Sequence, residues 1–420
     1  MINFLLKKYK NISYGINFYI FVLGLFFLPS AFTIGAILLL ISLLRTTFIN
    51  NKEFVLDRWS IFFLIASSFM VTSCIIHTFY NDYLYKYNLN SSLSWIGLGN
   101  WLPLFWCYTA FKPLLNNPEK RKISSIALLC GSLPLLFTGI GQYFFGWYGP
   151  FEFLNGFIVW YQRPIENHSG LTGLFNNANY MGAWLNIIWP IGIACLIDSS
   201  RNILNNISTY IFTLGISLST IFTFSRAAWI GIFLGTLLMY GKRIYKYLIA
   251  LIIVLTLVIS STVTPILGTG SQTFLKSFIP QSIWIKFSDF QYSRISIWKS
   301  GLNAIYNNPV FGSGASSFQQ IYIHETGLWK GHSHNLPMEL MISYGIPAAL
   351  LIIIPILTIV FISSRKILLK GNKVSIFDKS WITCLIVLLT SQMYDVQYFD
   401  GRISIILWLL ASGSTNIIKE

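Results

Sequence analysis

Charged residues are scarce in this chain. Only 10% of its 420 residues are Asp, Glu, Lys or Arg, whereas 54% are hydrophobic. Soluble globular domains carry roughly 25% charged residues. With a mean hydropathy of +0.62, this composition excludes a water-soluble globular protein.

Long polar segments are also few, so that apolar stretches of about 15 to 25 residues recur along the whole sequence. A hydrocarbon core about 30 Å thick requires helices of about this length, whereas a membrane β-barrel shows shorter alternating segments. We therefore expect an all-α polytopic membrane protein with about 12 transmembrane helices, forming a single integral membrane domain over residues 1–420. The predicted spans are 14–29, 31–45, 58–77, 94–114, 123–146, 180–197, 207–224, 227–240, 246–266, 335–363, 381–396 and 402–418.

Two apolar runs, 14–45 and 207–240, fit either one long helix or a tight pair. The distribution of positive charge favours pairs: with twelve spans and an inner N-terminus, 20 of the 29 basic residues fall in inner links, as the positive-inside tendency requires. Merging either pair would place the basic clusters at 120–122 or 365–379 outside. We therefore expect outer turns near Pro29 and near Arg226, and both termini in the cytoplasm.

Cysteines are few and isolated, which limits their possible roles. Cys74, Cys107, Cys130, Cys195 and Cys384 all fall in apolar stretches without paired spacing, so neither a disulfide framework nor a cysteine metal site is expected. The net charge of +15 is explained by orientation and by anionic lipid headgroups. We therefore expect the lipid bilayer, and no nucleic acid, as a partner.

Nine basic residues remain on the outer side, where the orientation signal predicts few. They are Lys86, Arg163, Arg226, Lys276, Lys286, Arg294, Lys299, Lys330 and Arg402. The histidines also map to this side or its margin: His77, His168, His324, His332 and His334. Chemistry is therefore expected on the outer face.

Two outer segments are long, about 147–179 and about 267–334. In the second, the spacing of Ile295, Trp298, Leu302 and Ile305 gives one apolar helical face, which stops at an Asn-Asn-Pro sequence. This pattern predicts a short helix lying in the membrane interface.

Three outer arginines are candidates for binding an anion. Arg226 lies in the turn 224–229 (FSRAAW), Arg294 begins the predicted interfacial helix, and Arg163 lies in 161–164 (YQRP). A guanidinium forms paired hydrogen bonds to phosphate oxygens. The alternative is that each arginine only reaches from a helix end to the lipid headgroups.

A pair of histidines precedes a long predicted helix, in 331–335 (GHSHN). Histidine suits proton transfer near neutral pH, although a loop histidine is often only solvated. The spacing of His332 and His334 also suggests a metal, but no nearby cysteine or carboxylate cluster completes a ligand set. No metal or other cofactor is therefore expected.

Over roughly residues 160 to 350 the chain resembles the O-antigen ligase and O-antigen polymerase superfamily of membrane glycosyltransferases. The matching segments are 170–179 (GLTGLFNNAN), Ser225-Arg226, 294–314 with its Asn-Pro and Gly-x-Gly ending, and His334-Asn335 followed after nine residues by Gly345. There are two departures. Ala178 stands where many members have proline, and His332 is a second histidine beside the motif.

The resemblance implies a metal-independent, inverting transfer of glycan from polyprenyl (undecaprenyl) diphosphate to an acceptor hydroxyl, at the periplasmic side of the bacterial inner membrane. It assigns catalysis to Arg226, Arg294 and His334, since a diphosphate leaving group needs fixed cations and inversion needs one base. The expected substrate-binding residues are Arg163, Asn179, His332 and Asn335. The acceptor stays open: lipid A core for a ligase, another lipid-linked glycan for a polymerase.

Two other functions were weighed against this one. A secondary transporter, such as the bicarbonate type proposed within the same superfamily, would place ionisable groups near the bilayer midplane and show repeated halves. A non-catalytic assembly partner would not need the outer arginines and histidine. The charged residues are expected to gather at the outer margin of the membrane, which favours the enzyme over both alternatives.

Overall fold

The computed structural model describes residues 15–49, 57–79, 87, 89–165, 170–198, 203–263, 268–278, 294–371 and 374–420. Lys86, Lys286 and His168, three of the expected outer residues, lie outside these ranges. The described chain is mostly helical, as predicted. One departure is a small antiparallel hairpin within the segment 147–179, formed by β1 (Phe151–Phe153) and β2 (Ile158–Trp160).

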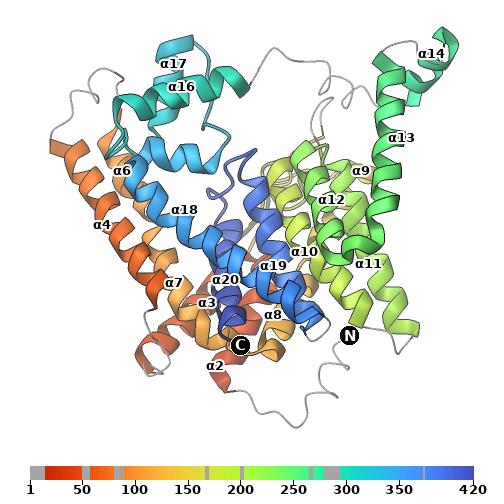
Figure 1. Cartoon of the computed structure of the whole chain (residues 1–420), viewed down its shortest axis with the longest axis horizontal. Helices are drawn as coiled ribbons and strands as arrows, with labels where there is room; N and C mark the ends of the chain where they lie inside the picture. Colours follow the sequence, from red (N-terminus) through yellow and green to blue (C-terminus); the bar gives the residue numbers. More distant parts are fainter. Residues whose placement is uncertain are drawn as a thin grey trace.

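Apart from α14, α16 and α17, which lie in the segment 267–334, the helices follow the predicted apolar runs in order (Figure 1). They are α2 (Ile16–Phe27), α3 (Phe32–Leu44), α4 (Arg58–Phe79), α6 (Ser91–Leu98), α7 (Leu102–Phe111), α8 (Pro118–Gly131), α9 (Leu133–Phe145), α10 (Ala178–Asp198), α11 (Ile203–Phe222), α12 (Arg226–Tyr240), α13 (Tyr245–Val263), α14 (Thr269–Phe278), α16 (Arg294–Asn307), α17 (Ser317–Thr326), α18 (Leu336–Lys370), α19 (Ile376–Ser391) and α20 (Gly401–Lys419). Much of the buried core lies around α10, α19 and α20, where Trp184 and Trp381 are fully enclosed.

Within the described ranges, seven helical segments are long and apolar enough to cross a membrane, and α12, α2 and most of α11 are shorter apolar helices. The predicted spans 94–114 and 123–146 are each divided into two helices, α6 with α7 and α8 with α9. The multi-pass membrane architecture therefore agrees with the sequence, and the count of about 12 spans stays a prediction.

Both ambiguous runs are pairs of helices, as charge indicated. Helix α2 ends at Phe27 and α3 begins at Phe32. They pack closely because Gly35 has no side chain: a Cβ there would lie 2.6 Å from the backbone of Leu28. Helices α11 and α12 are separated by residues 223–225, where Phe224 has a φ of 49°.

Ion pairs join several predicted inner links at one end of the bundle. The fully buried Arg121 pairs with Asp378 at 2.6 Å and with Glu420 at 2.9 Å. Next to it, Lys122 pairs with Asp198 at 2.6 Å. The starts of α8 and α19 and the ends of α10 and α20 thus lie together, at the lower end of the molecule in Figure 1.

Predicted outer links meet at the opposite end. The indole nitrogen of Trp160 donates to the carbonyl oxygen of Ser30 at 2.7 Å, joining the β-hairpin to the turn between α2 and α3. Likewise, the backbone N–H of Leu171 donates to the carbonyl oxygen of Phe222 at 2.8 Å. Helices α16 and α17 lie at this upper end (Figure 1). These contacts join several predicted inner links at one end of the bundle and several predicted outer links at the other, and which end faces the periplasm stays a prediction.

Helix α18 is broken at Gly345, where φ is 84°. A Cβ at this position would overlap the carbonyl group of Val310. The backbone N–H of Ile346 donates to the carbonyl oxygen of Pro309 at 2.8 Å. The backbone N–H of Ser313 donates to the carbonyl oxygen of Ile342 at 2.6 Å. Backbone from the Asn-Pro and Gly-x-Gly motif therefore supplies partners at the break, so two of the sequence motifs form one contact.

The helix predicted as interfacial is present as α16, and its predicted apolar face is divided: Ile305 is buried and Trp298 packs partly against the same cluster, whereas the other two side chains are exposed. Ile297 is buried, whereas Ile295 and Leu302 are 74% and 59% exposed. At Gly301 a Cβ would overlap the sulfur of Met338 on α18, so a small residue allows close packing there. The exposed apolar side chains are suited to contact lipid, as an interfacial helix requires.

Candidate functional site

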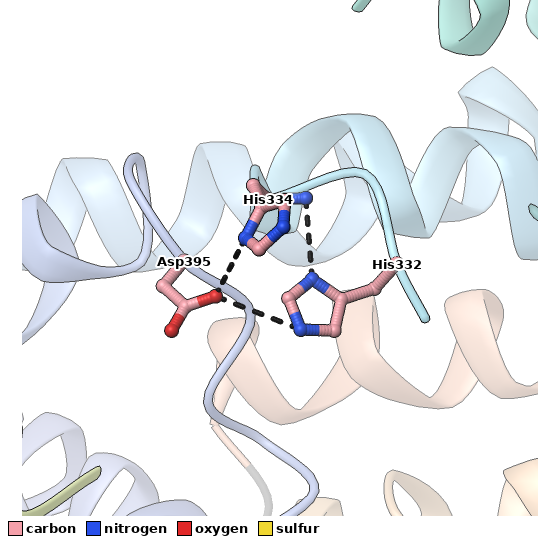
Figure 2. A group of neighbouring side chains, drawn as sticks. All are labelled: His332, His334 and Asp395. Atoms are coloured by element: carbon pink, nitrogen blue, oxygen red, sulfur yellow. Dashed lines mark hydrogen bonds and ion pairs between the residues drawn. The ribbon is translucent and has the colours of Figure 1, made fainter. Parts of the chain in front are cut away.

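Both histidines of the GHSHN segment converge on one carboxylate (Figure 2). His334 Nδ1 lies 2.9 Å from Oδ1 of Asp395, and His332 Nε2 lies 3.6 Å from the same oxygen. The side chain of Asp395 is only 4% exposed, and it belongs to the loop between α19 and α20. Asn179 Nδ2, from the start of α10, donates to the other oxygen of Asp395 at 2.9 Å.

The start of α18 fixes the position of His334. The side chain of Asn335 caps this helix by accepting from the backbone N–H of Met338 at 3.0 Å. Its amide nitrogen also donates to the carbonyl oxygen of Met393 at 3.3 Å, in the loop that carries Asp395. His334 itself has a φ of 53°, a left-handed conformation that is uncommon in non-glycine residues and often found at functional sites.

Hydrogen bonds determine which ring nitrogen of each histidine carries the proton. His332 Nδ1 accepts from the backbone N–H of His334 at 3.3 Å, so its own proton lies on Nε2, facing Asp395. Burial lowers the pKa of His332 to about 4, although the charge of Asp395 acts in the opposite direction. His332 is therefore neutral near pH 7.

In His334 the proton lies on the other ring nitrogen, because of Asp395. Burial alone would raise the pKa of Asp395, but the hydrogen bond from His334 and the nearby histidines hold that pKa below its ordinary value. An ionised carboxylate only accepts hydrogen bonds, so the proton of His334 lies on Nδ1. Its Nε2 then presents a lone pair, and 27% of the side chain is exposed. His334 is thus the histidine able to take a proton from a substrate.

Arg294 and Arg226 bring positive charge to the same region. Each is the first residue of its helix, α16 and α12 respectively, where the helix dipole adds to the positive potential. The guanidinium carbon of Arg294 lies 5.8 Å from the ring centroid of Tyr394, the residue before Asp395. Burial lowers the pKa of Arg294, and the charge of Arg226 lowers that pKa further, so the two cations act on one another.

The motif at 170–179 packs against the segment that precedes Arg226 and fixes the start of α10. At Gly170 a Cβ would overlap the backbone of Thr223, which precedes Arg226 by three residues. Asn177 Oδ1 accepts from the backbone N–H of Asn179 at 2.7 Å, and so helps to fix the start of α10. Ala178 is the first residue of α10, a position where proline also fits, which explains why this departure from the family pattern is tolerated.

Arg163 is the predicted site residue that the structure does not join to the others. Its backbone carbonyl oxygen accepts from Gln142 Nε2 at 2.6 Å, and its N–H donates to Thr172 Oγ1 at 3.1 Å. Its side chain is exposed, and no described contact connects it to the histidine and aspartate group. A role in substrate binding stays a prediction.

Sequence reasoning missed Asp395 and Tyr394. Neither lies in a recognised motif, and Asp395 is separated from His334 by 61 positions. One signal was present: the chain has only 14 acidic residues, and an ionisable residue at the edge of a predicted span is often functional.

The sequence showed no nearby cysteine or carboxylate cluster that could complete a ligand set with the histidines, but the structure places one carboxylate, Asp395, beside them. His332, His334 and Asp395 offer three ligand atoms within 4.8 Å of one another, the one such group found in the described part of the chain. However, Nδ1 of His334 and Oδ1 of Asp395 already form a direct hydrogen bond. This geometry is that of a histidine oriented by a carboxylate for proton transfer.

Comparison with known proteins agrees with the motifs. Residues 211–353 match the model of the O-antigen ligase family, a region that contains Arg226, Arg294, His332 and His334. The chain is also similar to the ComP-specific O-oligosaccharyltransferase of Acinetobacter baylyi, with 24% identity over 384 residues and 84% of this chain aligned. It spans 63% of the length of that relative. The resemblance seen in the sequence is thereby confirmed: this is a membrane protein that carries an O-antigen ligase domain.

Proposed function

We propose that the protein is an inverting glycosyltransferase that moves a glycan from polyprenyl (undecaprenyl) diphosphate to an acceptor hydroxyl, at the periplasmic face of the bacterial inner membrane. The family match and the relative support an O-antigen ligase type of glycosyltransferase. The observation that carries the finer proposal is the hydrogen bond between His334 and the buried Asp395, beside two helix-terminal arginines.

In this mechanism His334 acts as the general base. Its Nε2 takes the proton of the acceptor hydroxyl while the acceptor oxygen attacks the anomeric carbon of the donor sugar. The new bond forms on the face opposite the diphosphate, which inverts the configuration. Asp395 stabilises the imidazolium produced, as the carboxylate does in a catalytic triad, and the neutral His332 packs beside it.

The leaving diphosphate takes the electron pair of the broken C–O bond. Arg226 and Arg294 are fixed cations that stabilise this developing charge, and bidentate contacts from guanidinium groups suit phosphate oxygens. The N-termini of α12 and α16 contribute further positive potential. These groups provide the stabilisation without a metal ion, so we propose a metal-independent reaction.

The acceptor is proposed to be a glycan or lipid A core hydroxyl. The Acinetobacter baylyi relative is an O-oligosaccharyltransferase, a name that specifies transfer to oxygen, which fits a hydroxyl acceptor. Glycolipid analysis of a deletion strain distinguishes the two classes. Single repeat units left on lipid A would indicate a polymerase, and full chains left on undecaprenyl diphosphate would indicate a ligase.

The central test uses purified protein in proteoliposomes, with a polyprenyl diphosphate glycan as donor. We expect His334→Ala to lower the rate by about 10²- to 10⁴-fold while donor binding is retained, because the arginines are intact. His332→Ala, the matched control in the same loop, should have a much smaller effect. A metal chelator should leave the wild-type rate unchanged. Near-normal transfer by His334→Ala would refute the assignment of the base.

A further inference from the structure

Ser333, the residue between the two histidines of the site, is bound to a buried carboxylate. Its backbone N–H donates to Oε2 of Glu339 at 2.9 Å. Glu339 lies in the first turn of α18 and is only 1% exposed, and Ser333 itself is fully buried. Both imidazole rings meanwhile face Asp395 (Figure 2). The segment 332–334 is therefore held by an acidic side chain that the mechanism above does not use.

The sequence around Glu339 makes this carboxylate unusual. Glu339 is the only charged residue between His334 and Arg365. An ionisable side chain inside a predicted span is costly to bury and is usually retained for a function, whereas an apolar residue would fit the start of a membrane helix without that cost. The buried N–H of Ser333 requires an acceptor, and Glu339 supplies it.

Stabilising the helix end is a simpler role for Glu339, since a negative charge in the first turn suits the helix dipole. In a capping box, however, the acidic residue three positions after the N-cap bonds back to the N-cap residue itself. The N-cap of α18 is Asn335, so Glu339 lies one position later than in that box. Its bond reaches Ser333, two residues before the cap. The contact thus fixes the histidine segment and not only the helix end.

The start of α18 is also joined to the loop that carries Asp395. The backbone N–H of Leu336 donates to the carbonyl oxygen of Gln392 at 2.9 Å, next to the bond between Asn335 and Met393. One helix end therefore holds the aspartate loop through its cap and the histidine segment through Glu339. The short distance between the His334 and Asp395 side chains depends on both attachments.

We propose that Glu339 is a positioning residue, which holds His334 so that Nδ1 meets Asp395 and Nε2 faces the acceptor hydroxyl. This inference rests on the proposed function. Glu339 is enclosed and acts through Ser333, so it exchanges no proton with the substrate. Without the acceptor oxygen the segment 332–334 would shift, and a displacement of about 1 Å in a catalytic group can lower the rate about 10²-fold.

The first experiment compares two variants of similar size in the proteoliposome assay. Glu339→Leu removes the acceptor oxygens and should lower kcat by about 10- to 10²-fold, with the KM of the donor unchanged because the arginines are intact. Glu339→Gln keeps an oxygen that can accept from Ser333, so its kcat should stay within about threefold of the wild type. Equal losses of kcat in both variants, or an increase in KM alone, would overturn the proposal.

Asn117→Ala is the matched control for the stability of a helix start. Asn117 caps α8, at the opposite end of the bundle, by accepting from the backbone N–H of Lys120 at 2.9 Å. Its loss should lower the thermal unfolding temperature and leave kcat unchanged. If Asn117→Ala lowered kcat as Glu339→Leu does, the effect of Glu339 would be one of general stability and the proposal would fail.

A double variant tests whether Glu339 acts through His334. Residues that act as a unit have non-additive effects on the rate. In the background of His334→Ala, Glu339→Leu should therefore cause no further loss of the residual transfer rate. A second loss as large as the one in the wild-type background would show that Glu339 acts independently of the base, which contradicts the proposal.

Backbone hydrogen exchange separates this inference from the proposed function, because it does not depend on transfer. Exchange over a peptide that contains Ser333 should be faster in Glu339→Leu than in the wild type and unchanged in Glu339→Gln, since only the leucine variant lacks the acceptor. Unchanged exchange in Glu339→Leu would overturn the inference. Faster exchange in that variant, together with a wild type that transfers no glycan, would contradict the proposed function alone.

Discussion

At the scale of single residues, Asp395 determines what His334 can do. Its pKa lies below the ordinary value of 3.8, so the carboxylate is ionised across the neutral range. Its contribution to the stability of the fold is therefore fully present above that ordinary value and is lost as the pH falls through the folded pKa. Acid should weaken the site only well below neutrality.

Asp395→Asn should lower kcat by about 10²- to 10⁴-fold with little change in the KM of the donor, because the amide no longer holds the productive ring tautomer. Steady-state kinetics on purified protein measures both parameters. Asp400→Asn is the matched control: Asp400 lies in the same loop and pairs with Arg402 at 2.6 Å. A large loss of kcat in Asp400→Asn as well would indicate a general disturbance of the loop instead.

Tyr394 is expected to position Arg294 through its ring. Tyr394→Leu removes the aromatic face beneath the guanidinium, so the KM of the donor should rise about 2- to 30-fold. Tyr394→Phe keeps the face and should remain close to the wild type. The dependence of kcat on pH should be the same in all three proteins, since the base is untouched. Equal defects in the phenylalanine and leucine variants would assign the role to the hydroxyl group.

The sequence was informative about residues in motifs and uninformative about their partners. His334, Arg226 and Arg294 were selected as candidates because their residue types suit the chemistry and their spacing matches a family. The role of Asn179 was not foreseen, since it binds Asp395 and was expected to bind substrate. Asp395 was missed because a loop contact across 61 positions leaves no periodic pattern in one sequence.

At the scale of secondary structure, the break in α18 connects two segments that the sequence shows as separate motifs. Helix α16 was predicted as a helix, but not which of its apolar residues pack against the protein: small residues such as Gly301 allow close packing, which buries Ile305 and leaves Ile295 exposed. The β-hairpin was missed although its sequence carries Asn155-Gly156, a strong hairpin signal. No secondary structure had been predicted for the outer segment 147–179.

Gly345→Ala tests the contact at the break. It should lower the thermal unfolding temperature in detergent clearly more than Gly371→Ala does. Both glycines have positive φ, 84° and 52°, a conformation that costs a non-glycine residue about 1 to 3 kcal/mol. Only at Gly345 would the new Cβ also overlap the backbone of Val310, since nothing lies within 4 Å at Gly371. Equal decreases of the unfolding temperature in the two variants would mean that the contact between the 309–314 segment and the break in α18 does not stabilise the fold.

At the scale of the whole molecule, the two groups of links at opposite ends of the bundle lead to a prediction of sidedness. In a cysteine-free background, Gln320→Cys should react with a membrane-impermeant maleimide in intact cells, because Gln320 lies on α17 at the expected outer end. Asn116→Cys, at the opposite end, should react only after permeabilisation. Both residues are exposed. Labelling of Asn116→Cys in intact cells would reverse the orientation that the positive charges indicate.

The pairing of Arg121 with Asp378 has a consequence for how the protein is made. These residues are 257 positions apart, which at about 5 to 20 residues per second corresponds to roughly 10 to 50 s of synthesis. Until Asp378 emerges from the ribosome, Arg121 lacks this partner, and burying its charge would be unfavourable. The start of α8 is therefore expected to remain hydrated at the membrane surface during translation, and the bundle closes around it only after α19 has been inserted.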